Sequence, residues 1–144
     1  MSANPETTPA PRQLADFVGH WSLARVIRHA DGRVDRFSGT ATWHTPVGGR
    51  APYHETGTLT LDGGMTLHAD RRYVWDQDLQ VWFADGGFFH AVPSLGGCAT
   101  HFCAPDTYDV AYDFGDWSRW QATWRVTGPA KDYVMTSQFA PADR

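Results

Sequence analysis

Hydrophobic and polar residues alternate along most of the chain, which is the pattern of short antiparallel strands with one buried face. From Tyr53 to Leu61 every second residue belongs to a mostly apolar face, and the residues between them are one histidine and three threonines. Turn residues separate such runs at intervals of roughly 8 to 12 residues. The alternation therefore predicts about ten short strands. The clearest further runs lie at residues 21–27, 37–43, 108–114, 120–126 and 133–139.

The turn Asp62-Gly63-Gly64 sets the register of the two strands on either side of it. If Leu61 lies opposite Met65, counting back along both arms places Glu55 opposite Arg71. A glutamate then meets an arginine on the mostly apolar face, and we expect a cross-strand ion pair between them.

Three further turns extend this register. They are Asp76-Gln77-Asp78, the type I′ signal Asp85-Gly86, and the longer connection from Pro93 to Gly97. Counted through them, the opposed pairs are Trp75 and Leu79, Tyr73 and Val81, Phe83 and Phe88, Val81 and His90, and finally His90 and His101.

A meander of about ten twisted strands removes its edges by closing on itself. The predicted fold is therefore all-β: a closed antiparallel up-and-down barrel of about ten strands. Residues 11–18 predict one short helix, because Pro11 is tolerated in a first helical turn and Gly19 can end the helix. This helix is short enough to plug one end of the barrel. Side chains alone do not fill a barrel of this width, so we expect an internal cavity.

Length and composition indicate one domain. The chain has 144 residues, of which 42% are hydrophobic and 14% aromatic, enough for one well-buried domain over residues 14–144 and too few for a second. Residues 1–13 contain three prolines and no apolar run, so we expect a disordered arm, with neither a secretory signal nor a membrane span. The expected compartment is the cytoplasm, where Cys98 and Cys103 stay reduced.

The charge distribution narrows the choice of partners. A net charge of -4 without a basic cluster argues against nucleic acid, because phosphate binding needs a concentrated positive face. Among the 12 basic residues, Lys131 is the only lysine. Arginine suits bidentate contacts with carboxylate or phosphate groups and partly buried sites. The expected partner is a small molecule, with no nucleic acid and no membrane.

Gly19-His20-Trp21, at the start of the first predicted strand, resembles the Gly-x-Trp signature of lipocalins and related fatty-acid-binding barrels. A wider set of positions resembles a family of uncharacterised bacterial proteins of about this length. These positions are Gly19-x-Trp21, Arg25, Tyr53-x-Glu55-x-Gly57, Arg72-Tyr73-x-Trp75, Asp85-Gly86, Phe89-His90, His101-x-Cys103-x-Pro105-Asp106-x-Tyr108 and Gly128-Pro129-x-Lys131-Asp132-Tyr133. The resemblance covers nearly the whole domain and implies a lipocalin-like, or calycin-like, barrel of unknown function.

The inward face carries charged and polar residues among its aromatic and aliphatic ones, which is costly unless these groups are paired or wet. One interpretation is a structural network in which Glu55 and Arg71 pair. The other is the polar floor of a ligand cavity, where arginine and histidine donors hold an anionic or carbonyl-bearing ligand and aromatic rings hold its apolar body. The two interpretations are compatible. The candidate ligand-binding residues are Arg25, Glu55, Arg71, Tyr73, His90, His101, Tyr112 and Trp124.

The favoured hypothesis for function is an intracellular barrel that binds a small amphipathic molecule. The alternative is a small-molecule acid/base enzyme of the isomerase, cyclase or hydratase type, in which His90 and His101 move a proton with Tyr108 as their partner. The sequence specifies no cofactor. The minor alternatives are zinc held by His90, His101 and Cys103, and haem held by one inward histidine.

Aromatic residues also fall on the outward face. Trp43, Trp82, Phe89 and Trp117 are expected to be exposed, and Trp82 would pair with Phe89 across the outer face of the Asp85-Gly86 hairpin. Such a pair is a candidate for a homodimer contact.

Overall fold

One antiparallel sheet of ten strands makes up almost all of the structure, a computed structural model that describes residues 10–142. This confirms the predicted all-β fold. Residues 1–9 of the predicted disordered arm lie outside the described residues. The elements are α1 (Leu14–Phe17), β1 (Gly19–His29), β2 (Val34–Trp43), β3 (Arg50–Thr60), β4 (Thr66–Asp76), β5 (Gln80–Phe83), β6 (Phe88–Ala91), β7 (Gly97–Cys103), β8 (Asp106–Asp116), β9 (Arg119–Thr127) and β10 (Asp132–Pro141).

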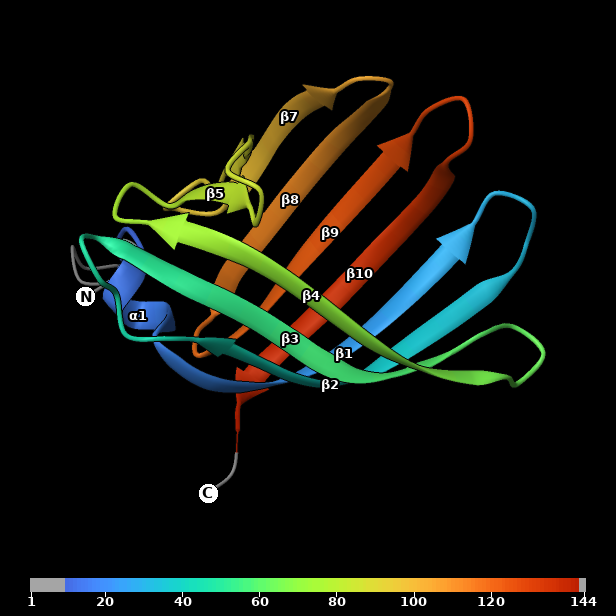
Figure 1. Ribbon diagram of the computed structural model, residues 1–144, viewed down its shortest axis with the longest axis horizontal. Helices are drawn as coiled ribbons and strands as arrows, with labels where there is room; N and C mark the ends of the chain where they lie inside the picture. The colour runs from blue at the N-terminus through green and yellow to red at the C-terminus, as the bar shows by residue number, and fades with distance from the viewer. Residues whose placement is uncertain (1–9, 143–144) are drawn as a thin grey trace, which may run out of the picture.

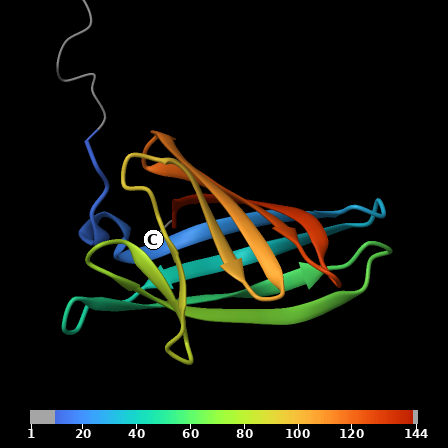
Figure 2. The same cartoon turned by 90° about the horizontal axis from the view of Figure 1, so that it is seen from above.

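The strands follow the order β6-β5-β4-β3-β2-β1-β10-β9-β8-β7, so β1 and β10 lie side by side in the middle of the sheet. The sheet curls until its two edge strands, β6 and β7, approach each other without forming a hydrogen-bonded ladder in the described residues. Figures 1 and 2 show β1–β4 as one layer and β7–β10 as another that crosses it. The barrel is therefore nearly closed, with one seam between β6 and β7.

The predicted register of the β3–β4 hairpin is confirmed. Glu55 on β3 lies opposite Arg71 on β4, as the turn at residues 62–64 requires. Arg25 on β1 lies opposite Phe37 on β2, so the two inner faces of that hairpin coincide. Each of these strands places its apolar positions toward the interior, because period-two alternation keeps one face buried.

The predicted β4–β5 register is wrong by two residues. Trp75 pairs with Val81 instead of Leu79, and Tyr73 pairs with Phe83. The turn is longer than predicted because the carboxylate of Asp76 accepts hydrogen bonds from the amides of residues 78 and 80, at 2.9 and 3.0 Å, and Leu79 adopts a positive φ of 58°. Because side chains alternate between the two faces of a strand, a register shift of two residues leaves every side chain on its predicted face.

A β-bulge changes the next hairpin. Val81 pairs with His90 as predicted, but the partner of Phe88 is Trp82 and not Phe83. The bulge directs two consecutive residues inward, so Phe89 and His90 are both buried, with 1% and 2% of their surface exposed. The prediction that Phe89 is exposed is therefore wrong.

Phe88 takes the outward position that was predicted for Phe89. It is 40% exposed, and its ring centroid lies 5.2 Å from that of Trp82. An aromatic pair on the outer face of this hairpin is thus present with one member exchanged, and its role in a homodimer stays a prediction.

The chain from Pro93 to Gly97 does not form the symmetric hairpin that would place His90 opposite His101. In the described residues β7 pairs only with β8, where His101 lies opposite Tyr108. The connection instead carries the chain from one edge of the sheet to the other, which is why no turn type could set a register across it.

The helix α1 closes one end of the barrel, as predicted, beside the β5–β6 hairpin (Figure 1). Phe17 is fully buried, with ring centroids 5.2 to 5.7 Å from those of Trp43, Trp75, Trp117 and Trp120. Trp43 was expected to be exposed, but the β1–β2 register places it on the inner face, where 1% of it is exposed. No helix in residues 10–142 is long and apolar enough to cross a membrane.

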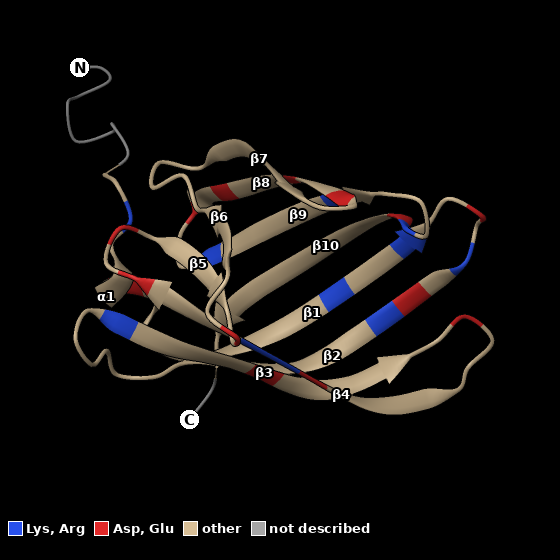
Figure 3. Ribbon diagram, turned by 45° about the horizontal axis from the view of Figure 1, so that its top comes forward, with Lys and Arg blue, Asp and Glu red and all other residues tan. Residues whose placement is uncertain are grey.

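Charged residues are distributed over many strands and turns. In the view of Figure 3, positions of Lys and Arg occur on several strands, with positions of Asp and Glu on the same or neighbouring strands. The absence of a nucleic-acid partner stays a prediction that this distribution supports.

The backbones of β2 and β3 come unusually close where Gly39 lies opposite Gly57. A Cβ atom on Gly39 would lie 2.1 Å from the carbonyl oxygen of Thr56 and 2.7 Å from the Cα of Gly57. Neither glycine can carry a side chain unless the strands separate, so the pair permits the close approach of the two strands.

We expect Gly39→Ala to lower the free energy of unfolding by about 2 kcal/mol or more, since overpacking typically costs about 1 to 3 kcal/mol and the clashing atoms here are backbone. Urea denaturation measures the change. Gly87→Ala is the matched control, because the atom nearest to its Cβ would be a carboxylate oxygen of Asp85 at 3.4 Å. Its stability should stay within about 1 kcal/mol of the native value, and equal losses in both variants would contradict the close approach.

Candidate functional site

A buried carboxylate, Glu55, is the centre of a polar layer that crosses the barrel interior. Its Oε1 accepts hydrogen bonds from Nη2 of Arg25 at 3.0 Å and from the hydroxyl of Tyr53 at 2.5 Å. Its Oε2 accepts from Nη1 of the same arginine. Arg25 Nε donates to Ser137 Oγ at 2.7 Å. These four residues, from β1, β3 and β10, are called the polar layer below.

The ion pair joins two strands that are not neighbours. Arg25 lies opposite Phe37 on β2, while Glu55 on β3 lies opposite Ala41 of the same strand. Between Phe37 and Ala41 on this inner face stands Gly39, which has no side chain. The guanidinium can therefore reach across β2, and the glycine that lets β2 approach β3 also leaves room for the pair.

The predicted ion pair between Glu55 and Arg71 is wrong, although their register is right. Arg71 is half-buried and forms no ion pair in the part of the chain that the structure describes. Glu55 pairs with Arg25 and not with Arg71, although Arg71 lies opposite it on the neighbouring strand. Arg25 approaches Glu55 from the other side with two parallel donors and is itself almost fully buried.

Both members of the Arg25–Glu55 pair are held in their charged forms. Burial acts to raise the pKa of Glu55, but the hydrogen bonds and charge of Arg25, with the hydroxyl of Tyr53, lower it below its ordinary value. Burial acts to lower the pKa of Arg25, and Glu55 raises it above its ordinary value. The polar layer therefore holds one positive and one negative charge and is neutral overall.

His90 and Tyr112 form a second buried contact in the interior. His90 Nε2 lies 2.9 Å from the hydroxyl of Tyr112. Burial lowers the pKa of His90 to about 3, and the charge of His101 acts in the same direction. Burial also raises the pKa of Tyr112. Both groups are therefore uncharged near neutral pH.

A small cavity lies between the polar layer and the aromatic rings packed around α1. Its volume is about 30 Å³, and its walls include Arg25, Glu55, Tyr73, His90, Tyr112 and Trp124. Such a volume has room for about two water molecules. The expected cavity is thus present but much smaller than the roughly 300 to 1,000 Å³ of ordinary ligand sites, because large aromatic side chains occupy the space.

Phe89 packs against four half-buried aromatic residues, of which Tyr73 and Trp124 also contribute to the cavity walls. Its ring centroid lies 4.6 Å from Phe83, 5.0 Å from Tyr108, 5.2 Å from Trp124 and 5.8 Å from Tyr73. These five residues are called the Phe89 cluster below. Because four of them are only partly buried, they form a continuous aromatic surface from the cavity wall toward solvent.

Four residues of the cavity walls carry a buried nitrogen atom that has no hydrogen-bond partner among the described residues. These atoms are Nε1 of Trp43, Trp120 and Trp124, and Nδ1 of His90. A buried polar atom without a partner costs free energy. The interior is therefore prepared for additional hydrogen bonds.

Most of the predicted site residues come together. Arg25, Glu55, Tyr73, His90, Tyr112 and Trp124 all contribute to the cavity walls. Sequence reasoning missed Tyr53, Ser137 and Trp120 as site residues, although the alternation places each of them on an inner face, and it expected Trp43 on the outer face. The alternation shows which face of the sheet a residue occupies, but not how far along the barrel axis it lies.

His101 and Tyr108 lie apart from the cavity. The ring centroid of His101 lies 5.5 Å from that of Phe88 and 6.1 Å from that of Phe89. Phe89 also contacts His90, so it lies next to both histidines. The alternative zinc site is not formed: in residues 10–142 no group of three or more His, Cys, Asp or Glu is arranged to hold a metal. A haem does not fit a cavity of about 30 Å³.

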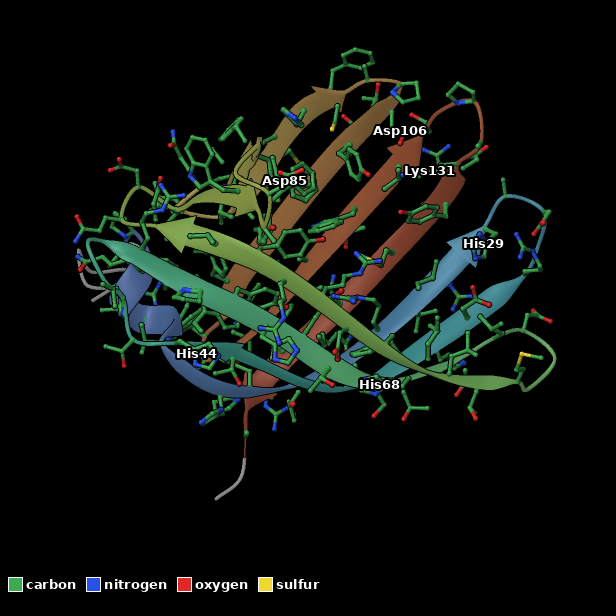
Figure 4. All side chains as sticks on the ribbon, viewed as in Figure 1. His29, His44, His68, Asp85, Asp106 and Lys131 are labelled. Atoms are coloured by element: carbon green, nitrogen blue, oxygen red, sulfur yellow. The ribbon has the colours of Figure 1, made fainter. Side chains whose placement is uncertain are left out.

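At the end of the barrel away from α1, charged side chains pair with one another. Figure 4 shows Asp106 and Lys131 together at that end and His29 at the tip of β1. Lys131 Nζ lies 2.9 Å from Asp106 Oδ2, and His29 Nε2 lies 2.8 Å from Asp35 Oδ2. Arg71 differs from these groups, since it faces the interior without a charged partner among the described residues.

The sequence profile of a family of unknown function (DUF6314) matches residues 17–141. A search of curated proteins found no match. Among solved structures, the S-type phycobiliprotein lyase CPES from Guillardia theta is similar, with a TM-score of 0.63 and 7% sequence identity over 91% of this chain and 91% of that chain. At this identity the likeness shows the fold, a lipocalin-like barrel, and nothing of the ligand.

We expect Arg25→Met to destabilise the protein by about 3 to 5 kcal/mol, because it leaves the Glu55 carboxylate buried without its cation. The double variant Arg25→Met/Glu55→Gln should recover part of that loss. Arg71→Met is the matched control and should cost less than about 1 kcal/mol, since Arg71 forms no ion pair among the described residues. A double-mutant cycle of urea denaturation measures all three, and strictly additive losses for Arg25 and Glu55 would disprove their coupling.

A second prediction concerns pH. The folded protein keeps His90 neutral down to about pH 3, whereas the unfolded chain protonates it near the ordinary value of 6.5. The stability that depends on neutral His90 is therefore complete above pH 6.5 and is lost progressively as the pH falls from 6.5 toward 3. The loss attributable to one such group is at most about 1.4 kcal/mol per pH unit.

Denaturation over this pH range should show a weaker pH dependence in His90→Gln than in the native protein. His44→Gln, which changes an exposed histidine, is the control and should leave the pH dependence unaltered. An NMR titration that shows His90 gaining a proton near pH 6.5 would contradict its burial in neutral form.

Proposed function

Since the chain belongs to the family of unknown function (DUF6314), whose name identifies no ligand, we propose from its interior that it binds a small amphipathic molecule inside the barrel. The ligand carries an anionic or carbonyl group. Its oxygen-bearing end enters the cavity beside the polar layer, and its apolar body lies against the Phe89 cluster.

The single observation that carries this proposal is the set of unpartnered nitrogen atoms beside a buried ion pair. Removing charges from water costs several kcal/mol per ion, and well-packed apolar residues are often at least as stabilising as a buried pair. A barrel that served only as a scaffold would gain nothing from four further polar atoms without partners. Ligand recognition gives these groups a purpose, because a few convergent polar atoms in an aromatic pocket are typical of small-molecule sites.

The cavity volume limits how the ligand sits. About 30 Å³ accommodates only a terminal group of two or three atoms, so the rest of the ligand must extend over the Phe89 cluster. Partly buried aromatic rings supply apolar contact area at a low cost in conformational entropy. Tyr73 and Trp124 belong both to this surface and to the cavity walls, so one ligand can contact the two together.

The acid/base enzyme is supported less well. A general acid or base works best when its pKa lies near the operating pH, and the pKa of His90 is lowered to about 3 by burial. His101, the second proposed proton carrier, does not contribute to the cavity walls. His90 is better suited to hydrogen bonding than to proton transfer.

Binding can be tested with prodan, a neutral aromatic ketone, and with 1-anilinonaphthalene-8-sulfonate, an aromatic anion, because the emission of both dyes changes in an apolar environment. At least one of them should bind to the native protein in a fluorescence titration. Ala122→Val adds two methyl groups to a wall of the cavity and should weaken this binding severalfold, since a cavity of about 30 Å³ cannot accept both the methyl groups and a ligand.

The matched control is Ala24→Val, at an exposed position on the outer face of β1, which should leave binding unchanged. Equal binding by the native protein and both variants would place the dye on the outer surface. That outcome, or no binding of either dye, would refute the proposed function.

A further inference from the structure

We infer that the inner cavity is selective for a neutral carbonyl oxygen, as in a ketone, ester or amide, over a carboxylate or a hydroxyl group. This inference rests on the proposed function and specifies the chemical class of its ligand. The proposed function allows a ligand with an anionic group, a carbonyl group or both. Here the carbonyl group binds in the cavity, and an acid group binds at Arg71 outside it.

The unpartnered groups of the cavity are mainly hydrogen-bond donors. An indole nitrogen donates and cannot accept, and Nε1 of Trp43, Trp120 and Trp124 lacks a partner. The rings of Trp43 and Trp120 are neighbours, with centroids 5.9 Å apart. Each ring also lies near a tyrosine of the polar interior. The ring centroids of Trp43 and Tyr53 are 4.5 Å apart, and those of Trp120 and Tyr112 are 6.3 Å apart. A ligand atom between these donors must be an acceptor.

The strongest acceptor of the cavity is already occupied. Glu55 accepts two hydrogen bonds from Arg25 and one from Tyr53, which leaves little capacity for a ligand donor. A ligand hydroxyl would bring a proton that needs an acceptor, either a hydroxyl oxygen of the walls (Tyr73, Tyr112 or Ser137) or His90 Nδ1 in one of its two tautomers. Each of these wall hydroxyl groups carries a proton of its own that also needs a partner. In the other tautomer Nδ1 carries a proton and adds a fourth donor to the three indoles. A carbonyl oxygen, which has two lone pairs and no proton, matches this set better than a hydroxyl group.

The cavity also has no charge to offer an anion. The guanidinium of Arg25 is neutralised by Glu55 through two hydrogen bonds, and His90 is uncharged near neutral pH. A carboxylate placed here would lose its hydration without gaining a counter-charge, which costs far more than burying a neutral carbonyl.

Arg71 supplies the positive charge that the cavity lacks. It is half-buried, it lies on the inner face of β4 opposite Glu55, and it forms no ion pair among the described residues. It does not contribute to the cavity walls, whereas its neighbour on the same face, Tyr73, does. An acid group elsewhere on the ligand would therefore meet Arg71 while the carbonyl occupies the cavity.

Three probes that share a 2-phenylethyl group and differ in the group attached to it separate these possibilities: 4-phenylbutan-2-one, 4-phenylbutan-2-ol and 3-phenylpropanoate. Binding to the uniformly ¹⁵N-labelled full-length protein is followed through the indole N–H signals of its 7 tryptophans. The ketone should move the Trp43 and Trp120 indole protons downfield, as hydrogen bonding to oxygen does. It should bind about two- to tenfold more tightly than the alcohol, the range expected for one neutral hydrogen bond, and should also exceed the acid.

Trp82 is an internal control in the same spectra, because its Nε1 already donates to Asp76 at 3.0 Å and its signal should stay in place. Trp43→Phe and Trp120→Phe assign the two signals; if either variant does not fold, triple-resonance assignment of the native protein replaces it. Arg71→Gln should weaken the acid severalfold and leave the ketone unchanged.

The inference is overturned if the acid or the alcohol binds as tightly as the ketone, or if the ketone binds without moving either indole signal. Failure of all three probes, with prodan or the sulfonate dye still bound in the barrel, would also overturn it while leaving the proposed function intact. Failure of every probe and both dyes would remove the proposed function as well.

Discussion

The buried pair of Arg25 and Glu55 is the interaction around which the interior is arranged. It joins β1 to β3 across β2, and Ser137 on β10 extends it to the other side of β1. A charged pair in a dry interior tolerates few geometries, because each lost hydrogen bond exposes a charge to an apolar environment. The pair therefore fixes the relative positions of three strands at the level where the cavity begins, and the side chains around it must fit these positions.

Much of the fold was predictable because its determinants are local. Period-two alternation and Gly-containing turns fixed the number of strands, and a shift of two at the β4–β5 turn left each inner face unchanged. The turn at Asp76 and the bulge before His90 were not predictable from spacing, since a side-chain cap and an unpaired residue change the count without changing the composition.

The sequence predicted which residues of the candidate site face the barrel interior, but not which of them contact one another. The period-two alternation identified Arg25, Glu55, His90 and Tyr112 as inward-facing residues. Counting along hairpins reveals only neighbours on adjacent strands. The true partner of Glu55 lies two strands away and reaches it over a glycine. Packing of this kind depends on the curvature of the sheet, which no short stretch of sequence encodes.

The seam between β6 and β7 gives this barrel a property that a fully closed one lacks. Where every strand has two hydrogen-bonded neighbours, the circumference can increase only by breaking backbone ladders, and the lumen has one size. Here the two edges meet through side chains alone, with Phe88 and Phe89 against His101. Parting them breaks aromatic contacts but no ladder of the described sheet. Parting this seam would therefore enlarge the lumen without loss of any ladder of the described sheet, which a fully closed barrel does not permit.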